Sequence, residues 1–357
     1  MTAVYQENAR TADEPLISVC ISSYNYADRL IRALEVIKSQ KEDADFEVII
    51  SDDASSDDSV ARAAQFAAEN RDMRIRVFVN ETNEGILANK SHLIEHACGR
   101  YILFCDSDDE LAPGALEILS GAAAAAKADC VVGYVQDVDA DGQVIQVQDF
   151  SRTPSKWMVS LLHGSLYRRS VIEKHCLRFT QMPEDAVFNL QFHEQSKHVV
   201  FVRKPVYRWF VNPQSEGRKK KRLEVEQITE RFGANCRTFR EVMERVAARG
   251  KAGKVCGTEA QEIEFELMKI YYGDLLMANL SVAPLQRMAV YRSMRTSMQA
   301  ACPEYLRNPN LFTGKRCIAR GYAAKIVRWC ARFERLGLLA PVLRCYYLLR
   351  RFVFLDQ

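Results

Sequence analysis

Paired cysteines and long apolar runs are both missing from this chain. Its eleven cysteines stand singly among 357 residues, with no Cys-x-x-Cys pair. This spacing argues against a zinc ribbon or a disulfide framework and favours a reducing compartment. No segment approaches the roughly 18 consecutive apolar residues of a membrane-spanning helix, and residues 1–14 lack a basic stretch followed by an apolar one. We therefore expect a cytoplasmic protein that does not span a membrane.

A strong overall charge is also missing, since the net charge is only +3. The charge is uneven, however: from residue 315 onward ten Lys and Arg face two acids, so residues 315–357 carry +8 and residues 1–314 carry −5. Aromatic residues are interleaved with these cations, a pattern that suits a peripheral helix on an anionic membrane. Packing against the rest of the chain or against a second copy is the alternative, which leaves a homo-oligomer through the C-terminal helices open. Nucleic acid is not expected, because no recognition module accompanies the basic tail.

Short apolar segments alternate with helical patterns in the first half of the chain. Residues 16–22, 46–51, 74–79 and 101–105 have the pattern of buried strands, and each is followed by a loop and a helical stretch or an acidic loop. This alternation predicts an α/β fold with a mostly parallel sheet flanked by helices. Ligands of such sheets bind beyond the carboxyl ends of the strands.

Residues 199–202 and 205–210 have the pattern of two further strands. From residue 223 onward the pattern changes to helices without strands, and the last helical stretch, residues 317–354, is expected to break near Pro341. We therefore predict a polar leader at residues 1–14, an α/β domain at residues 15–217 and a helical C-terminal region at residues 218–357. Within the α/β domain we distinguish residues 15–110 from residues 111–217.

One apolar segment ends abruptly in three carboxylates. Asp106, Asp108 and Asp109 directly follow the strand pattern of residues 101–105. Mg²⁺ or Mn²⁺ bound by one or two carboxylates leaves room for substrate phosphates, so the spacing suggests a metal–diphosphate site. The alternative is that Asp108 and Asp109 only cap a helix that begins near Pro113.

Four motifs occur in a characteristic order, at residues 18–25, 50–57, 83–85 and 104–109. In order and spacing they resemble the family 2 glycosyltransferases, which are inverting enzymes with the Rossmann-like GT-A fold. The resemblance covers about residues 15–212. It implies that residues 15–110 are the nucleotide-binding half of the domain and residues 111–217 the acceptor half. It implies a donor site for a nucleotide sugar, with UDP as the expected nucleotide, and a divalent cofactor, Mn²⁺ or Mg²⁺.

The resemblance also assigns roles to individual residues. Asp108 and Asp109 are the expected metal ligands. The side chains expected to contact the nucleotide are Ser23, Tyr24, Asp52, Asp53, Lys90, Asp106, Ser107 and Asp108. For some of these a purely structural role is the alternative: Asp52 and Asp53 would be turn and cap residues, Lys90 a solvated helix cation and Tyr24 a packing residue.

A second acidic pair, Glu184 and Asp185, follows a proline and opens a helical stretch. Its position resembles the Glu-Asp motif of the family. Inverting transfer needs a carboxylate that takes the proton of the attacking hydroxyl, and Asp185 is the candidate base. Glu184, His163 and Gly164 are expected on the acceptor side, although a helix-terminal acid pair and a structural histidine are the alternatives.

The sequence thus predicts a transferase of the hexosyl or N-acetylhexosaminyl type. The acceptor would be a hydroxyl of a glycan or lipid-linked glycan, in the bacterial type of surface-polysaccharide synthesis. A non-catalytic sugar-nucleotide-binding scaffold of the same fold is the first alternative. A zinc peptidase is the second, because His92, Glu95 and His96 match a His-x-x-Glu-His pattern.

Overall fold

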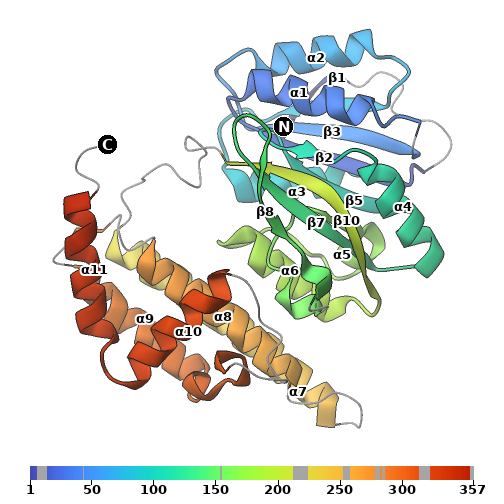
Figure 1. Ribbon diagram of the computed structural model, residues 1–357. Coiled ribbons are helices and arrows are strands. Elements are labelled where there is room, and N and C mark those ends of the chain that lie inside the picture. The colour runs from blue at the N-terminus through green and yellow to red at the C-terminus, as the bar shows by residue number, and fades with distance from the viewer. Residues whose placement is uncertain are drawn as a thin grey trace. The chain divides into compact units, whose positions relative to one another are not determined.

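The structure is a computed structural model (Figure 1). It describes residues 1–5, 14–42, 44–152, 155–211, 224–251, 258–277, 282–283, 286–312 and 322–353. The chain divides into two compact units. The sheet unit comprises Met1–Thr180 and Glu184–Pro213, and the helical unit comprises Gln181–Pro183 and Gln214–Gln357.

The described residues of the sheet unit form one 10-stranded mixed sheet. Its strands are β1 (Thr2–Tyr5), β2 (Ile17–Ser23), β3 (Phe46–Asp52), β4 (Ile75–Val79), β5 (Tyr101–Asp106), β6 (Glu110–Leu111), β7 (Cys130–Val138), β8 (Val144–Gln148), β9 (Ser165–Arg168) and β10 (Val199–Phe210). They follow the order β1-β4-β3-β2-β5-β9-β7-β10-β6, with β8 paired to β7. Strands β4, β3, β2 and β5 run parallel to one another, as does β10 to β7. The predicted α/β fold with a mostly parallel sheet is therefore confirmed.

Six helices cover the two faces of this sheet (Figure 1). They are α1 (Ala27–Lys38), α2 (Ser59–Glu69), α3 (Ile86–His96), α4 (Ala115–Ala126), α5 (Arg169–Lys174) and α6 (Glu184–Gln195). Side chains of a strand point alternately to the two faces, as β3 illustrates. Val48 and Ile50 belong to the apolar cluster that includes residues of α1, α2 and α4, whereas Ile49 belongs to the cluster that includes residues of α3, α5 and α6. Both faces are apolar because both are covered, which explains the continuous hydrophobic runs of the parallel strands.

Three boundaries differ from the prediction. Residues 2–5, assigned to a polar leader, form β1 and pair antiparallel with β4. The segment after Asp109 first forms the short strand β6, and α4 begins only at Ala115, with Gly114 at its N-cap and no side-chain cap. The alternative in which Asp108 and Asp109 merely cap this helix is therefore wrong. The predicted strands at residues 199–202 and 205–210 are one strand, β10, whose register shifts at Pro205.

The helical unit contains α7 (Val225–Lys251), α8 (Thr258–Leu276), α9 (Arg287–Ala301), α10 (Tyr322–Arg335) and α11 (Leu339–Val353). Its core includes the buried carboxylate of Glu334, which accepts hydrogen bonds from Tyr272 and Tyr305 at 2.8 and 2.7 Å. We predicted that the last helix breaks near Pro341, but it breaks at Gly337, whose φ of +69° suits glycine. Pro341 lies in the first turn of α11, where proline fits a helix. None of the helices within the described ranges is long and apolar enough to cross a membrane.

Candidate active site

The carboxyl ends of three neighbouring parallel strands form one wall of the candidate site. Ser22 near the end of β2 lies opposite Asp106 at the end of β5, and its hydroxyl donates to Asp106 Oδ1 over 2.9 Å. On the other side of β2, Ser23 lies opposite Asp52, the last residue of β3. The sheet thus brings together acidic loops that are far apart in sequence, as expected for this edge of a parallel sheet.

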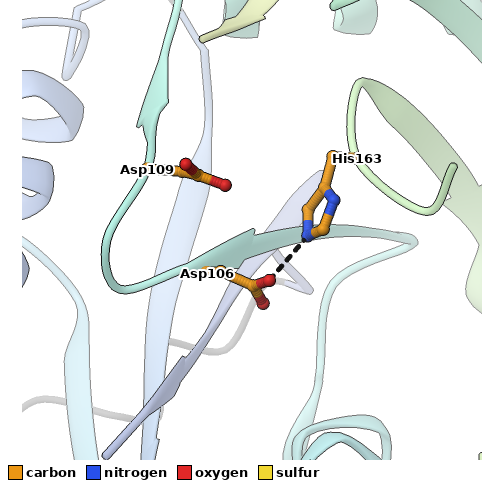
Figure 2. Close-up of side chains that lie close together, drawn as sticks. All are labelled: Asp106, Asp109 and His163. Atoms are coloured by element: carbon orange, nitrogen blue, oxygen red, sulfur yellow. Dashed lines mark ion pairs between the residues drawn. The ribbon is translucent and has the colours of Figure 1, made fainter. Parts of the chain in front are cut away.

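Two cations hold the Asp106 carboxylate. Lys90 Nζ on α3 lies 3.4 Å from Asp106 Oδ1, and His163 Nε2 lies 3.1 Å from Oδ2; Figure 2 shows the imidazole and the carboxylate pointing toward each other. Burial opposes ionisation of Asp106, but Lys90 and His163 outweigh it and hold the pKa of this carboxyl well below its ordinary value. Burial alone would lower the pKa of His163, whereas Asp106 raises it to about 9. At neutral pH the pair is therefore an imidazolium beside a carboxylate.

Lys90 connects this pair to a second group of acids. Its side chain is buried, and Nζ lies 3.8 Å from Glu184 Oε1 and 3.8 Å from Asp185 Oδ1. Burial alone would lower the pKa of Lys90, but Asp106, Asp185 and Glu184 together raise it above its ordinary value. The alternative of a solvated helix cation is therefore wrong: Lys90 is a buried positive charge among three carboxylates.

The first turn of α6 supplies those two acids. Asp185 Oδ2 accepts the backbone N–H of Leu162 over 3.2 Å and lies 3.8 Å from His163 Nδ1. Asp185 Oδ1 has no hydrogen-bond partner within the described part of the chain. Burial raises the pKa of Glu184, partly opposed by Lys90 and reinforced by Asp185. The site therefore holds one carboxylate with an unused acceptor oxygen and a neighbour with increased proton affinity.

Asp109 is held by two residues of β10. The Tyr207 hydroxyl donates to Asp109 Oδ2 over 2.9 Å, and the Phe210 N–H donates to Oδ1 over 2.8 Å. The same Tyr207 oxygen accepts the Asp106 N–H over 3.1 Å, and its ring stacks on His163 with centroids 4.8 Å apart. Burial raises the pKa of Asp109 well above its ordinary value. Sequence reasoning missed Tyr207. Val206 and Tyr207 are both buried, and the register of β10 shifts between Pro205 and Tyr207, so no simple alternation in the sequence marks Tyr207.

Three of these side chains could hold a metal ion. Asp106, Asp109 and His163 each offer a ligand atom, and the three atoms lie within 4.8 Å of one another (Figure 2). Two carboxylate oxygens and an imidazole nitrogen suit a first-row divalent ion such as Mn²⁺. The raised pKa of the buried Asp109 also fits, because a cation would supply the positive charge that this carboxylate lacks. His163 would have to bind as the neutral imidazole, so binding would release its proton.

Asp108, which we predicted as a metal ligand with Asp109, is not part of this three-residue group. Its carboxylate lies 3.9 Å from Arg29 Nη1 on α1 and is partly exposed. Its metal role stays a prediction, as does that of Asp109.

Asp52 and Asp53, two of the predicted nucleotide contacts, have clear structural partners. Asp52 accepts the N–H and the hydroxyl of Ser55, both over 2.7 Å, and so closes the turn after β3. Asp53 accepts the N–H groups of Glu84 and Gly85 over 2.8 Å each, and thereby fixes the turn before α3. Gly85 has φ +85°, which that turn requires. Asp52 and Asp53 thus stabilise two turns, and their contact with the nucleotide remains a prediction.

The remaining predicted residues lie around the same edge. Ser107 is buried, and its N–H donates to the carbonyl of Ser22 over 3.1 Å. Tyr24 is half-buried in the loop after β2. Gly164 follows His163 with φ +74°, and a Cβ there would lie 2.9 Å from Val135 Cγ2. Glycine at this position therefore allows His163 to lie against β7.

The histidines of the zinc-peptidase alternative face different partners. His92 Nε2 lies 2.9 Å from Glu84, whereas the His96 ring stacks on Phe78 with centroids 4.0 Å apart. Among the described residues, His92, Glu95 and His96 do not form a three-ligand group. This geometry argues against the peptidase alternative.

A mostly parallel α/β sheet with acidic loops at its carboxyl edge defines the Rossmann-like class of fold, whose ligands bind at that edge. Residues 18–179 match the family described as glycosyl transferase family 2. The predicted GT-A fold is also confirmed by solved structures. Residues 1–349 of S. aureus TarS in complex with UDP superpose with a TM-score of 0.64 and 18% identity, over 94% of this chain and 91% of that one.

Curated relatives agree with the family. The putative glycosyltransferase EpsH of Bacillus subtilis (strain 168) is 27% identical over 217 residues, which are 56% of this chain and 62% of EpsH. The GalNAc(5)-diNAcBac-PP-undecaprenol beta-1,3-glucosyltransferase of Campylobacter jejuni is 36% identical over 106 residues, 29% of this chain and 33% of that protein. The chain thus spans less than two thirds of each relative.

Proposed function

We propose that this protein is an inverting glycosyltransferase that moves a sugar from a nucleotide donor to a hydroxyl of a glycan acceptor. One observation carries the proposal: Lys90 joins Asp106, at the nucleotide-binding edge of the sheet, to Glu184 and Asp185 on α6. A donor-side carboxylate and a candidate base are thereby held in one charge network. A transferase needs this proximity, because the acceptor oxygen must reach the anomeric carbon while the donor is bound.

Asp185 is the proposed base. In direct displacement, the acceptor oxygen bonds to the anomeric carbon as the bond to the nucleotide diphosphate breaks, and the hydroxyl proton passes to a carboxylate. Asp185 Oδ1 is suited to this step because it has no hydrogen-bond partner among the described residues, while Oδ2 is fixed by the Leu162 N–H. Lys90 and His163 face Asp185 at 3.8 Å each and hold the carboxylate in place.

The donor side of the proposed site combines a metal-binding group with nucleotide contacts. Asp106, Asp109 and His163 would hold a divalent ion, Mn²⁺ or Mg²⁺, which when bound would offset the negative charge on the diphosphate leaving group. The proposed nucleotide contacts are Ser23, Tyr24, Asp52, Asp53, Lys90, Asp106, Ser107 and Asp108. UDP is the proposed nucleotide, supported by the UDP complex of TarS, and the sugar would be of the hexosyl or N-acetylhexosaminyl type.

The proposed acceptor is a lipid-linked glycan of a surface polysaccharide. The support comes from relatives: the Campylobacter jejuni protein is named for a glycan on undecaprenyl diphosphate, and another similar protein is a succinoglycan biosynthesis protein of Rhizobium meliloti.

Two neighbouring substitutions test the base assignment. We expect D185N to lower turnover about 10²–10⁴-fold while the Kd for UDP stays within about twofold, since a general base acts on the acceptor rather than on the nucleotide. E184Q removes the same charge one residue away and serves as the matched control, with an expected loss below about tenfold. If E184Q abolishes transfer and D185N does not, Glu184 is the base. Equal loss of UDP affinity and turnover in D185N would contradict a role in proton transfer.

A further inference from the structure

The exposed surface of α10 and α11 combines cations with large apolar side chains. Among the described residues, the large hydrophobic side chains exposed there are Trp329, Leu336, Leu338 and Leu348, with exposed fractions of 63%, 63%, 46% and 58%. Such residues are normally scattered singly over a protein surface, so a group within two consecutive helices calls for an explanation.

The pattern follows one face of α10. Lys325, Trp329, Arg332 and Leu336 are exposed and recur at intervals of four, three and four residues, which align on one side of a helix. The opposite side, which includes Val327 and Ala331, is buried in the helical unit. Helix α10 therefore packs normally through its buried side, and the apolar residues on its exposed side are additional to that core.

The connection to α11 continues this surface. Leu336 and Leu338 flank Gly337 in the turn between the helices. In α11, Arg344 and Leu348 are exposed four residues apart, while Leu343 is buried on the other side. We call the group Lys325, Trp329, Arg332, Leu336, Leu338, Arg344 and Leu348 the α10–α11 surface.

Helices α10 and α11 contribute no exposed acid to this surface. Residues 322–353 contain seven Lys and Arg and one acid, Glu334. Glu334 is buried, where Tyr272, Tyr305 and the Arg295 guanidinium surround its carboxylate. The acid therefore neutralises none of the exposed cations, and the surface presents positive charge and apolar side chains together.

We propose that the α10–α11 surface docks on an anionic lipid bilayer. Tryptophan and leucine enter the interface between headgroups and acyl chains, and Lys and Arg beside them attract anionic headgroups. A second copy fits less well, because a two-fold interface formed by this surface would bring the same cations together. The proposal does not depend on the glycosyltransferase assignment, since the vesicle experiment below needs no donor or acceptor.

Sedimentation of the full chain with lipid vesicles tests the proposal. The probe is vesicles of equal parts phosphatidylglycerol and phosphatidylcholine, with pure phosphatidylcholine as the neutral comparison. We expect binding to the anionic vesicles, at least tenfold weaker binding to neutral ones, and weaker binding as salt is raised. Reversing two charges with K325E/R332E should lower the apparent partition coefficient at least tenfold.

The control reverses two charges elsewhere. Lys174 and Arg203 are exposed residues of the sheet unit, and K174E/R203E changes the net charge by the same amount. We expect its partition coefficient within about twofold of the native value. If both double variants lose binding equally, the attraction is general rather than local and the proposal fails. Thermal unfolding of each variant checks that the fold is kept.

Brominated lipids provide a second, independent readout. Trp329 should be quenched by bromine in the acyl chains, and W329F should lose this quenching while it still binds. Three results would overturn the proposal: no binding of the full chain to anionic vesicles, no quenching that depends on Trp329, or a dimer that K325E/R332E dissociates in the absence of lipid. The last result would identify the surface as an interface between copies.

Discussion

Removal of the Lys90 charge should expose how strongly the site depends on one buried cation. K90M keeps most of the side-chain volume and leaves Asp106, Glu184 and Asp185 without the ammonium group that lies within 3.4–3.8 Å of each. Breaking a buried charge pair by removing one partner costs about 3–5 kcal/mol. The three carboxylates keep side-chain exposures of 19–27%, and water screens part of this cost. We therefore expect a loss of about 3 kcal/mol in the free energy of unfolding.

Urea unfolding at neutral pH measures this loss. The matched control is K38M, because Lys38 is an exposed helix lysine 3.9 Å from Glu35, and its loss should cost less than about 0.5 kcal/mol. In a D106N background, K90M should cost at least about 1 kcal/mol less than in the native chain, since one of the paired charges is already gone. The charge network would be refuted by a K90M protein within about 1 kcal/mol of native stability. It would also be refuted if K90M cost the same free energy of unfolding in the D106N background as in the native chain.

Two further predictions concern stability. Burial and the nearby Lys156 lower the pKa of His193 to about 3, so His193 stays neutral in the folded chain and titrates near its ordinary value in the unfolded chain. Its contribution to the free energy of unfolding is therefore fully present above that ordinary value and is lost as the pH falls. The expected loss is about 1.4 kcal/mol from pH 7.5 to 5.5 for this one group. H193L should remove that part of the slope in urea unfolding, and an unchanged slope would contradict the burial argument. A Cβ at Gly99 would lie 2.5 Å from the backbone nitrogen of Ser18, so G99A should lose more than about 2 kcal/mol, whereas G121A in the open on α4 should gain about 0.5–1 kcal/mol. Similar melting shifts for the two glycine variants would show that the close approach at Gly99 is not rigid.

The strand and helix alternation of the sheet unit could be predicted because both faces of the sheet are covered. A strand buried on both sides has an apolar centre, as Val48–Ile50 of β3 shows, and this signal is local in sequence. The boundaries that differed depend on non-local contacts. Strand β1 is exposed, has only four residues and forms by pairing with β4, so its own side chains carry little signal. The break at Gly337 rather than Pro341 reflects positive φ, which no hydrophobic pattern reports.

The candidate site could be predicted only as separate pieces. Asp106 and Asp185 each follow a local pattern, but their connection through Lys90 depends on α3 and α6 covering the same face of the sheet. The contact of His163 with Asp106 likewise requires β9 to pair antiparallel with β5, which places the loop before β9 at the carboxyl edge. Tyr207 reaches Asp109 because β10 pairs with β6 in a fixed register. Such pairings join residues distant in sequence, so a single sequence leaves them open.

Calorimetric titration with UDP, in the presence of Mn²⁺ and again with a chelator, tests the proposed donor site most directly. GDP is the comparison nucleotide, and D109N is the comparison variant. The account predicts that UDP binds more tightly than GDP, that chelation weakens binding at least tenfold, and that D109N reduces the effect of Mn²⁺. Absence of nucleotide binding under all of these conditions would contradict the assignment of the carboxyl edge of the sheet as a sugar-nucleotide site.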